Sequence, residues 1–131
     1  MDFLERLNDK INEVPNLPIN SKLGYLGATE SLVVYPLPGS QVINSYMDGT
    51  TDEAINYEVA MKSKSQEKIS DTLWKVTRAL EDTKEITSQD GSFEFDGLTI
   101  TNLPYINQAD EQGWHTFLVN LQARLTIKKR Q

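Results

Sequence analysis

The sequence predicts an α+β fold in which two helices form a single layer on a mostly antiparallel sheet. Apolar residues recur at intervals of three and four in two segments, residues 2–14 and 69–80, as they do along one face of a helix. Elsewhere they alternate with polar residues, most regularly over residues 115–127, as in a strand with one buried face. The strands come in runs separated by hairpin-sized turns, so we expect the order α-β-β-β-α-β-β.

Composition limits the classes of function. The chain has 131 residues and a net charge of -6, which predicts one domain over residues 1–131 without the basic face of a nucleic-acid reader. It has no cysteine, which excludes disulfides, thiolate metal sites and thiol nucleophiles. No run approaches the ~18 apolar residues of a membrane span, and the first residues carry acids where a signal peptide would be apolar. We therefore expect a soluble protein of the cytoplasm.

The first helix is predicted over residues 2–14. Asp2 can cap it, and Glu5, three places later, would complete a capping box. Pro15 and Pro18 end the helix, because each lacks a backbone donor and biases its predecessor toward extended geometry. The apolar stripe of this helix consists of Phe3, Leu4, Leu7, Ile11 and Val14.

The segments between the helices have strand character. Residues 22–27 are weakly strand-like, and residues 30–36 more strongly so because they are rich in β-branched and aromatic types. Residues 41–47 show an ambiguous pattern that indicates a strand with both faces partly covered. A polar turn at 48–53 joins it to the alternating segment 53–63, which predicts an antiparallel hairpin with one face in solvent. We therefore expect two or three strands between the helices, and the order α-β-β-β-α-β-β assumes three.

The second helix follows Ser63 or Ser65, either of which can cap it, and its apolar stripe is expected to dock on the sheet. A short strand over 93–101, bent near Gly97, comes next. The alternating run over 115–127 completes the sheet.

Three polar loops are long enough to reach a partner molecule, at residues 48–53, 84–92 and 104–113. The last belongs to the segment 102–113, NLPYINQADEQG, which we expect to connect the final two strands as a loop. Loops of this length often carry function.

No residues indicate a catalytic, cofactor-binding or metal-binding site. His115 is the sole histidine, whereas zinc binding or nucleophilic catalysis needs several ligands or a base with partners. Asp48, Asp52 and Glu53 lack the spacing of a calcium loop, so a solvated hairpin tip is the simpler interpretation. The glycines in LGYLG and DGTTD do not lead into a helix as those of a phosphate-binding loop do. We expect no cofactor and no metal.

Apolar and aromatic residues off the core stripes are candidates for contacts with other molecules. Trp74 lies about 140° around its helix from Ile69, away from the sheet-facing row; the alternative is that a loop half covers it. Leu118 interrupts the polar face of the last strand. Tryptophan and arginine are enriched at the energetic centres of interfaces. The candidate interface residues are therefore Trp74, Trp114, Leu118 and Arg124.

Three segments together resemble a known family. They are DFLERLNDKIN at the N-terminus, the helix MKSKSQEKISDTLWKVTRALED that follows a strand, and the ending ITNLPYINQADEQGWHTFLVNLQARLTI. In order and local sequence they resemble the minor capsid or tail-terminator (tail completion) proteins of long-tailed phages of Gram-positive bacteria. The resemblance covers essentially the whole chain, and QADEQGWHTF leading into the last strand is its most characteristic part.

The resemblance implies a structural protein, not an enzyme, that is assembled in the host cytoplasm and resides in the neck region of the virion tail. Proteins of this family form a hexameric ring on the head-proximal end of the tail tube, where the ring stops tube polymerisation and meets the head connector. The implied partners are other copies of the chain, the tail tube protein and the head connector or completion protein. No sequence-specific nucleic acid and no membrane is implied. Because DNA passes through the tail, we expect an acidic lining.

Two alternatives remain open on the sequence. A head-completion or connector protein would bind the portal side and would not cap tail tubes. A small enzyme or ligand-binding α+β domain would have a deep pocket lined by titratable groups with shifted pKa values.

Overall fold

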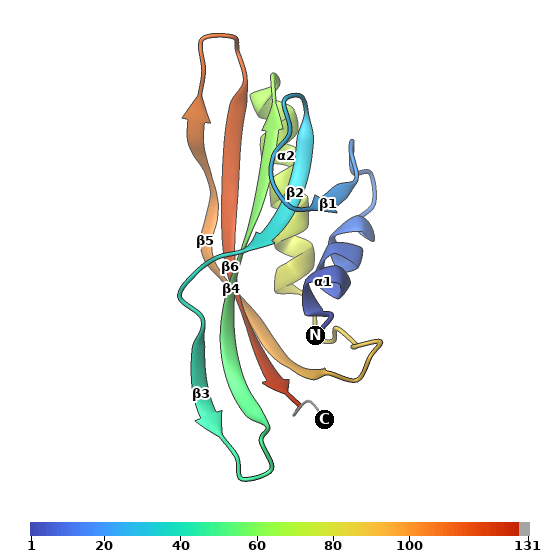
Figure 1. The fold of residues 1–131 in the computed structure, drawn as a ribbon. Coiled ribbons are helices and arrows are strands. Elements are labelled where there is room, and N and C mark those ends of the chain that lie inside the picture. The colour runs from blue at the N-terminus through green and yellow to red at the C-terminus, as the bar shows by residue number, and fades with distance from the viewer. Residues whose placement is uncertain (129–131) are drawn as a thin grey trace.

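The computed structural model describes residues 1–128, in which two helices cover one face of a long, twisted sheet (Figure 1). The α+β class is confirmed. The predicted order counts one strand too few, because the three-residue β1 is a separate strand that pairs in parallel with β2. The elements are α1 (Phe3–Asn12), β1 (Ser21–Leu23), β2 (Ser31–Pro36), β3 (Gln41–Ser45), β4 (Thr51–Ser63), α2 (Gln66–Glu81), β5 (Phe93–Ala109) and β6 (His115–Ile127).

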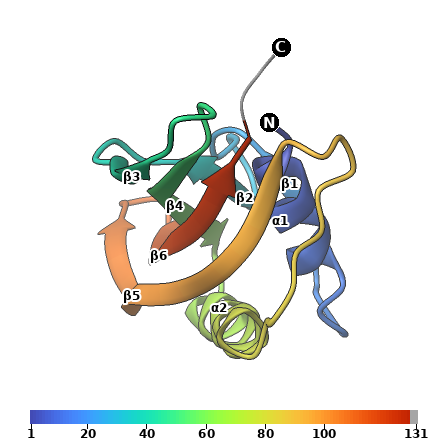
Figure 2. The same cartoon turned by 90° about the horizontal axis from the view of Figure 1, so that it is seen from below.

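The sheet has six strands in the order β1-β2-β4-β6-β5, and β3 pairs with β4 off this path. Every pair except β1 with β2 is antiparallel. One edge of β4 is shared, because β2 pairs with residues 57–62 and β3 with residues 51–54. The β3–β4 hairpin therefore extends beyond β2 at one end of the molecule (Figure 1), and β3 is remote from α2 (Figure 2).

The main core lies between the helices and the sheet. The Phe3 ring of α1 is fully buried, with its centroid 5.3 Å from that of Tyr57 on β4 and 5.2 Å from that of Phe93 on β5. Each large apolar side chain buried in this way contributes about 2 kcal/mol before the entropy of ordering is counted. The predicted stripe of α2 is also fully buried, as Ile69, Leu73, Val76 and Leu80.

Ser65 is the N-cap of α2. Its Oγ accepts a hydrogen bond from the backbone N–H of Lys68 at 3.2 Å, which satisfies one of the free donors of the first turn. Of the two serines that the sequence offers, Ser63 has another role, because its buried hydroxyl donates to Glu30 Oε2 at 2.7 Å.

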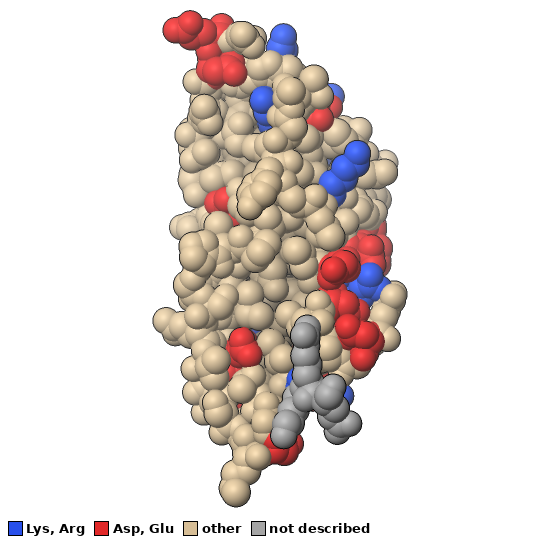
Figure 3. Space-filling model, in the orientation of Figure 1, with Lys and Arg blue, Asp and Glu red and all other residues tan. Residues whose placement is uncertain are grey.

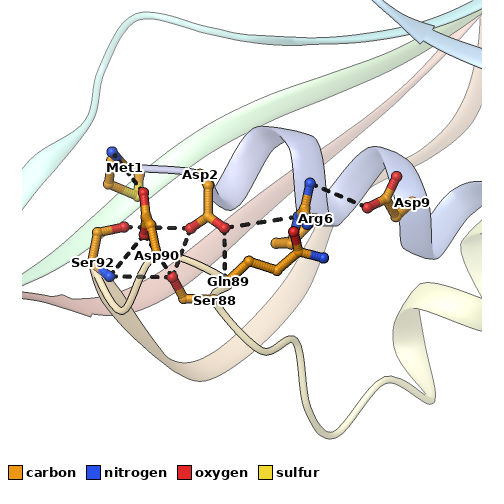
Figure 4. A network of polar contacts seen from close by, with 8 residues as sticks. All are labelled: Met1, Asp2, Arg6, Asp9, Ser88, Gln89, Asp90 and Ser92. Carbon is orange, nitrogen blue, oxygen red and sulfur yellow. Dashed lines mark hydrogen bonds and ion pairs between the residues drawn. The ribbon is translucent and has the colours of Figure 1, made fainter.

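Asp2 is the N-cap residue of α1, but its side chain makes no capping hydrogen bond, so the predicted capping box is wrong. Its carboxylate points to the loop before β5 instead (Figure 4), where it accepts from the Ser88 hydroxyl at 2.7 Å and the Gln89 backbone N–H at 2.8 Å. Ser92 and Ser88 in the same loop donate to Asp90, and these hydrogen bonds lower the pKa of the Asp90 carboxyl. The network fixes part of the 84–92 loop to the start of α1.

β5 is 17 residues long, so most of the segment predicted as a loop over 102–113 is strand. Its register with β6 shifts at four places, and such bulges bend a strand, which Figure 2 shows as a strong curve. Pro104 is tolerated because β5 is an edge strand that pairs with β6 alone. The connection that remains is residues 110–114, and the third long loop expected from the sequence is reduced to this tip.

Within the described residues, no helix is both long enough and apolar enough to cross a membrane.

Candidate assembly interface

Trp74 lies on the side of α2 that faces away from the sheet, as its position in the helix predicts, and is half-buried. One helical turn later, the guanidinium carbon of Arg78 lies 5.2 Å from its ring centroid. The segment 14–16, which follows α1, lies beside the ring. This segment covers part of Trp74, and the remainder of the ring is open to a partner.

Trp74 lines an open groove of about 560 Å³ between α2 and the segment 14–16, which we call the Trp74 groove. This volume is within the range of ligand-binding clefts, roughly 300–1,000 Å³. Its lining is largely apolar, with Val14 and Pro15 facing the helix. The helix contributes Asp71, Trp74, Lys75, Arg78 and Ala79.

Trp114 lies in the turn between β5 and β6, at the opposite end of the sheet from the β3–β4 hairpin (Figure 1). Its ring centroid is 5.3 Å from Lys62 Nζ and 5.1 Å from Lys64 Nζ. Its backbone N–H donates to Asp110 Oδ1 at 3.0 Å. Two cation–π contacts at a partly exposed site contribute about 0.5–1 kcal/mol each, so Trp114 has a role within the chain.

Leu118 is only 7% exposed. With Val33 and Ala60 it forms a second, small apolar cluster, against which Leu26 and Tyr35 pack. The cluster lies on the sheet face away from the helices, because Leu118 pairs with Ala60 and Ala60 with Val33 across three strands. Leu118 therefore offers little surface to another molecule, and its departure from the polar pattern is explained by this local packing.

Arg124 lies on the same face of β6. Its Nη1 donates to Thr99 Oγ1 on β5 at 2.9 Å. The guanidinium passes over Gly97, where an added Cβ would lie 2.6 Å from Nη2. The absence of a side chain at Gly97 thus leaves the space that Arg124 occupies.

The structure does not bring the four candidates together. Leu118 and Arg124 share one face of β6 but are about 20 Å apart at ~3.4 Å per residue. Trp74 is on the helix layer, and Trp114 is at the β5–β6 turn. Sequence reasoning placed Trp74 on the correct side of its helix but could not show which residues surround it.

A row of hydrogen-bonded polar side chains crosses the sheet face opposite the helices. Asn120 Nδ2 donates to Glu58 Oε1 at 3.1 Å, and the Tyr35 hydroxyl donates to the same carboxylate. Gln122 Nε2 donates to Asn56 Oδ1 at 3.1 Å. Burial, together with the hydrogen bond to Glu58, raises the pKa of Tyr35 above its ordinary value near 10. The sequence shows that polar residues alternate along β4 and along β6, but only the structure shows which residues of the two strands are paired.

Figure 3 shows this face of the molecule with few charged side chains across its centre. Two acids near the hairpin end, Asp52 and Asp96, each accept a hydrogen bond from Thr126 Oγ1 at 2.8 Å. With Glu58 they are largely offset by Arg124 and by Lys62, which the register places on the same face, so this face is close to neutral.

The β3–β4 hairpin carries apolar side chains that no other part of residues 1–128 covers. All five residues of β3 are exposed, so the expectation that both of its faces are partly covered is wrong. Val42 and Ile43 are more than half exposed, Tyr46 is half exposed, and Met47 at the tip is 108% exposed. The cause is that β3 pairs with β4 beyond the end of β2, where no helix lies over it. In the sequence these apolar residues adjoin the polar run DGTTDE, which we interpret as a solvated hairpin tip, so the sequence alone does not predict their exposure.

The described residues contain no group of three or more His, Cys, Asp or Glu side chains placed to hold a metal ion. His115 is the first residue of β6, and its Nε2 lies 3.5 Å from Nε2 of Gln66, the first residue of α2.

Comparison with known proteins identifies the family. The profile of the family described as "Bacteriophage tail terminator protein" matches residues 11–127. Among solved structures, a chain of the "Virion of native gene transfer agent (GTA) particle" has a similar fold, with a TM-score of 0.58 at 10% identity over 81% of this chain and 77% of that chain. No curated protein sequence matches. The family match extends from the end of α1 to the end of β6, and it is to a structural family and not to an enzyme family. This chain belongs to the bacteriophage tail terminator protein family.

Proposed function

We propose that the chain forms a ring at the head-proximal end of the phage tail tube, where it ends tube polymerisation and provides the surface that joins the tail to the head. The observation that carries this proposal is the family match over residues 11–127. In this proposal the ring has six subunits and resides in the neck region of the virion. Its partners are the tail tube protein on one side and the head connector or completion protein on the other.

The distribution of exposed apolar surface supports a ring. The β3–β4 hairpin and the Trp74 groove are unlike surfaces in different places: the hairpin is one end of the sheet, and the groove is on the helix layer (Figure 1). A two-fold dimer brings identical patches together, whereas unlike patches meet head to tail. Head-to-tail contacts close into a ring when the rotation between neighbours permits it.

We place the sheet face opposite the helices toward the lumen. That face is built from amide and hydroxyl side chains that hydrogen-bond to one another, such as Asn56 with Gln122. Its few charges nearly balance, so it has no basic stripe of the kind that binds DNA phosphates. The wall of a DNA channel needs this property, because tight phosphate contacts would arrest the moving DNA.

Purified tail tubes test the proposal. Tubes that still polymerise should stop growing when the protein is added, and electron microscopy should show added density at one end only. A head-completion protein would instead bind purified heads and leave tube growth unchanged. Continued growth of the tubes would therefore contradict the proposed function.

A further inference from the structure

We propose that the β3–β4 hairpin of one copy docks in the Trp74 groove of the next copy, with Met47 as the inserted side chain. The inference rests on the proposed ring and names the two surfaces that meet in it.

The hairpin is a preformed projection. The backbone N–H of Gly49 donates to the Tyr46 carbonyl at 3.0 Å, and the backbone N–H of Thr50 donates to Asp48 Oδ1 at 3.0 Å, which fixes the turn. The Tyr46 hydroxyl donates to Asp52 Oδ2 at 2.7 Å and holds the ring against the hairpin. Met47 is left fully exposed at the end of this structure. A projection that is ordered before binding loses less entropy when it docks.

The groove suits a methionine. Its walls are the Trp74 ring, Ala79 and the apolar side chains of Val14 and Pro15. A methionine side chain is flexible enough to fill an irregular apolar space, and its sulfur makes favourable contacts with aromatic rings. A half-covered tryptophan flanked by an arginine is also a common centre of binding energy at interfaces.

The charges around the two surfaces are complementary. Asp48 follows Met47 directly, and the hairpin over residues 41–54 has no lysine or arginine. The groove has two cations, Lys75 and Arg78, against one acid, Asp71. Arg78 already pairs with Glu81 at 3.2 Å, whereas no ion pair within residues 1–128 involves Lys75. Asp48 beside Lys75 is therefore the pairing that we expect.

The contact can form only between copies. In one chain the hairpin is the end of the sheet that extends away from α2, so its tip does not reach the groove of its own chain (Figures 1 and 2). Each copy then offers one hairpin and one groove, so the contact continues from copy to copy.

Because the natural chain has no cysteine, disulfide trapping gives a direct test. The full-length double variant Met47→Cys with Ala79→Cys is oxidised at a concentration where sedimentation shows assembly, and on capped tail tubes. Each chain carries both thiols, so the proposal predicts a ladder of covalent dimers, trimers and larger species. The matched control, Met47→Cys with Glu67→Cys, has the second thiol on the exposed first turn of the same helix, about 18 Å from residue 79 at ~1.5 Å per residue, and should give dimers at most.

A charge exchange tests the pairing without cysteines. Asp48→Lys and Lys75→Glu should each weaken assembly roughly five- to tenfold, and the chain that carries both should recover to within about threefold of the natural protein. Recovery would not follow if Asp48→Lys acted only by disturbing the turn.

The outcomes separate the two proposals. Assembly and tube capping without a ladder above the control would overturn the docking of the hairpin in the groove and leave the tail-terminator function standing. A chain that neither assembles nor caps tubes would overturn the proposed function and, with it, this contact.

Discussion

Replacement of Trp74 by alanine should weaken assembly more than it weakens folding. The neighbouring residue, Leu73, provides the matched control, because it is on the same helix turn but fully buried against the sheet. The pair of variants thus compares the outer and inner sides of α2.

The expected magnitudes follow from burial. Leu73→Ala removes a fully buried side chain and should lower the free energy of unfolding by about 3–5 kcal/mol. Trp74 is half-buried, so Trp74→Ala should cost about 1–2 kcal/mol, including the ~0.5–1 kcal/mol contact with Arg78. As the centre of an interface, the same tryptophan should contribute at least about 2 kcal/mol to association, which is roughly a 30-fold change in affinity.

Two measurements separate these effects. Guanidinium denaturation of the dilute chain gives the free energy of unfolding, and sedimentation velocity across a concentration series gives the assembly constant. The reasoning is refuted if Trp74→Ala destabilises the fold as much as Leu73→Ala does, or if it leaves the assembly constant unchanged.

Three further predictions concern the fold. Ser65→Ala should lower the free energy of unfolding by about 1 kcal/mol because it removes the N-cap of α2, whereas Ser65→Asp should restore it; chemical denaturation checks both. Asp2→Ala should speed hydrogen exchange at the backbone N–H of Gln89, which bonds to the Asp2 carboxylate, and unchanged protection would show that the network does not order the loop. Burial raises the pKa values of Tyr35 and Tyr57 above their ordinary value near 10, so both are favoured in the neutral form when folded. Their contribution to stability should be complete below pH 10 and be lost as the pH rises through the raised values, and denaturation curves from pH 8 upward should lose this dependence in the double Tyr→Phe variant.

Much of the fold could be predicted because local patterns and packing agree. The stripe of α2 has both a capping serine and four apolar residues at helical spacing, and all four are buried. β6 alternates over its whole length, and its predicted bounds are those observed. In such segments the periodicity reports directly which side faces the core.

The C-terminal half of β5 could not be predicted for a physical reason. Its register shifts break the two-residue period, and Pro104 removes a backbone donor, so the sequence has the composition of a loop. The strand forms there because β6 supplies its hydrogen-bond partners along one edge. The same kind of long-range pairing determines that Leu118 is buried, since its cover comes from β2 and the segment before it.

The candidate interface was only partly visible in the sequence. Helical geometry alone places Trp74 away from the sheet. Met47 is exposed because β3 pairs with β4 beyond the end of β2. Where β2 ends depends on its pairing with residues 57–62 of β4, which are distant from it in the sequence, so the local pattern around Met47 does not show it. For this reason the sequence indicated one side of the proposed contact and missed the other.

The most direct measurement of tail-terminating function is electron microscopy of phage particles assembled without this protein. If the ring ends polymerisation and joins the tail to the head, those preparations should contain tails longer than normal that lack heads, and supplying the protein should restore normal length. Tails of normal length that are joined to heads in its absence would contradict the proposed function.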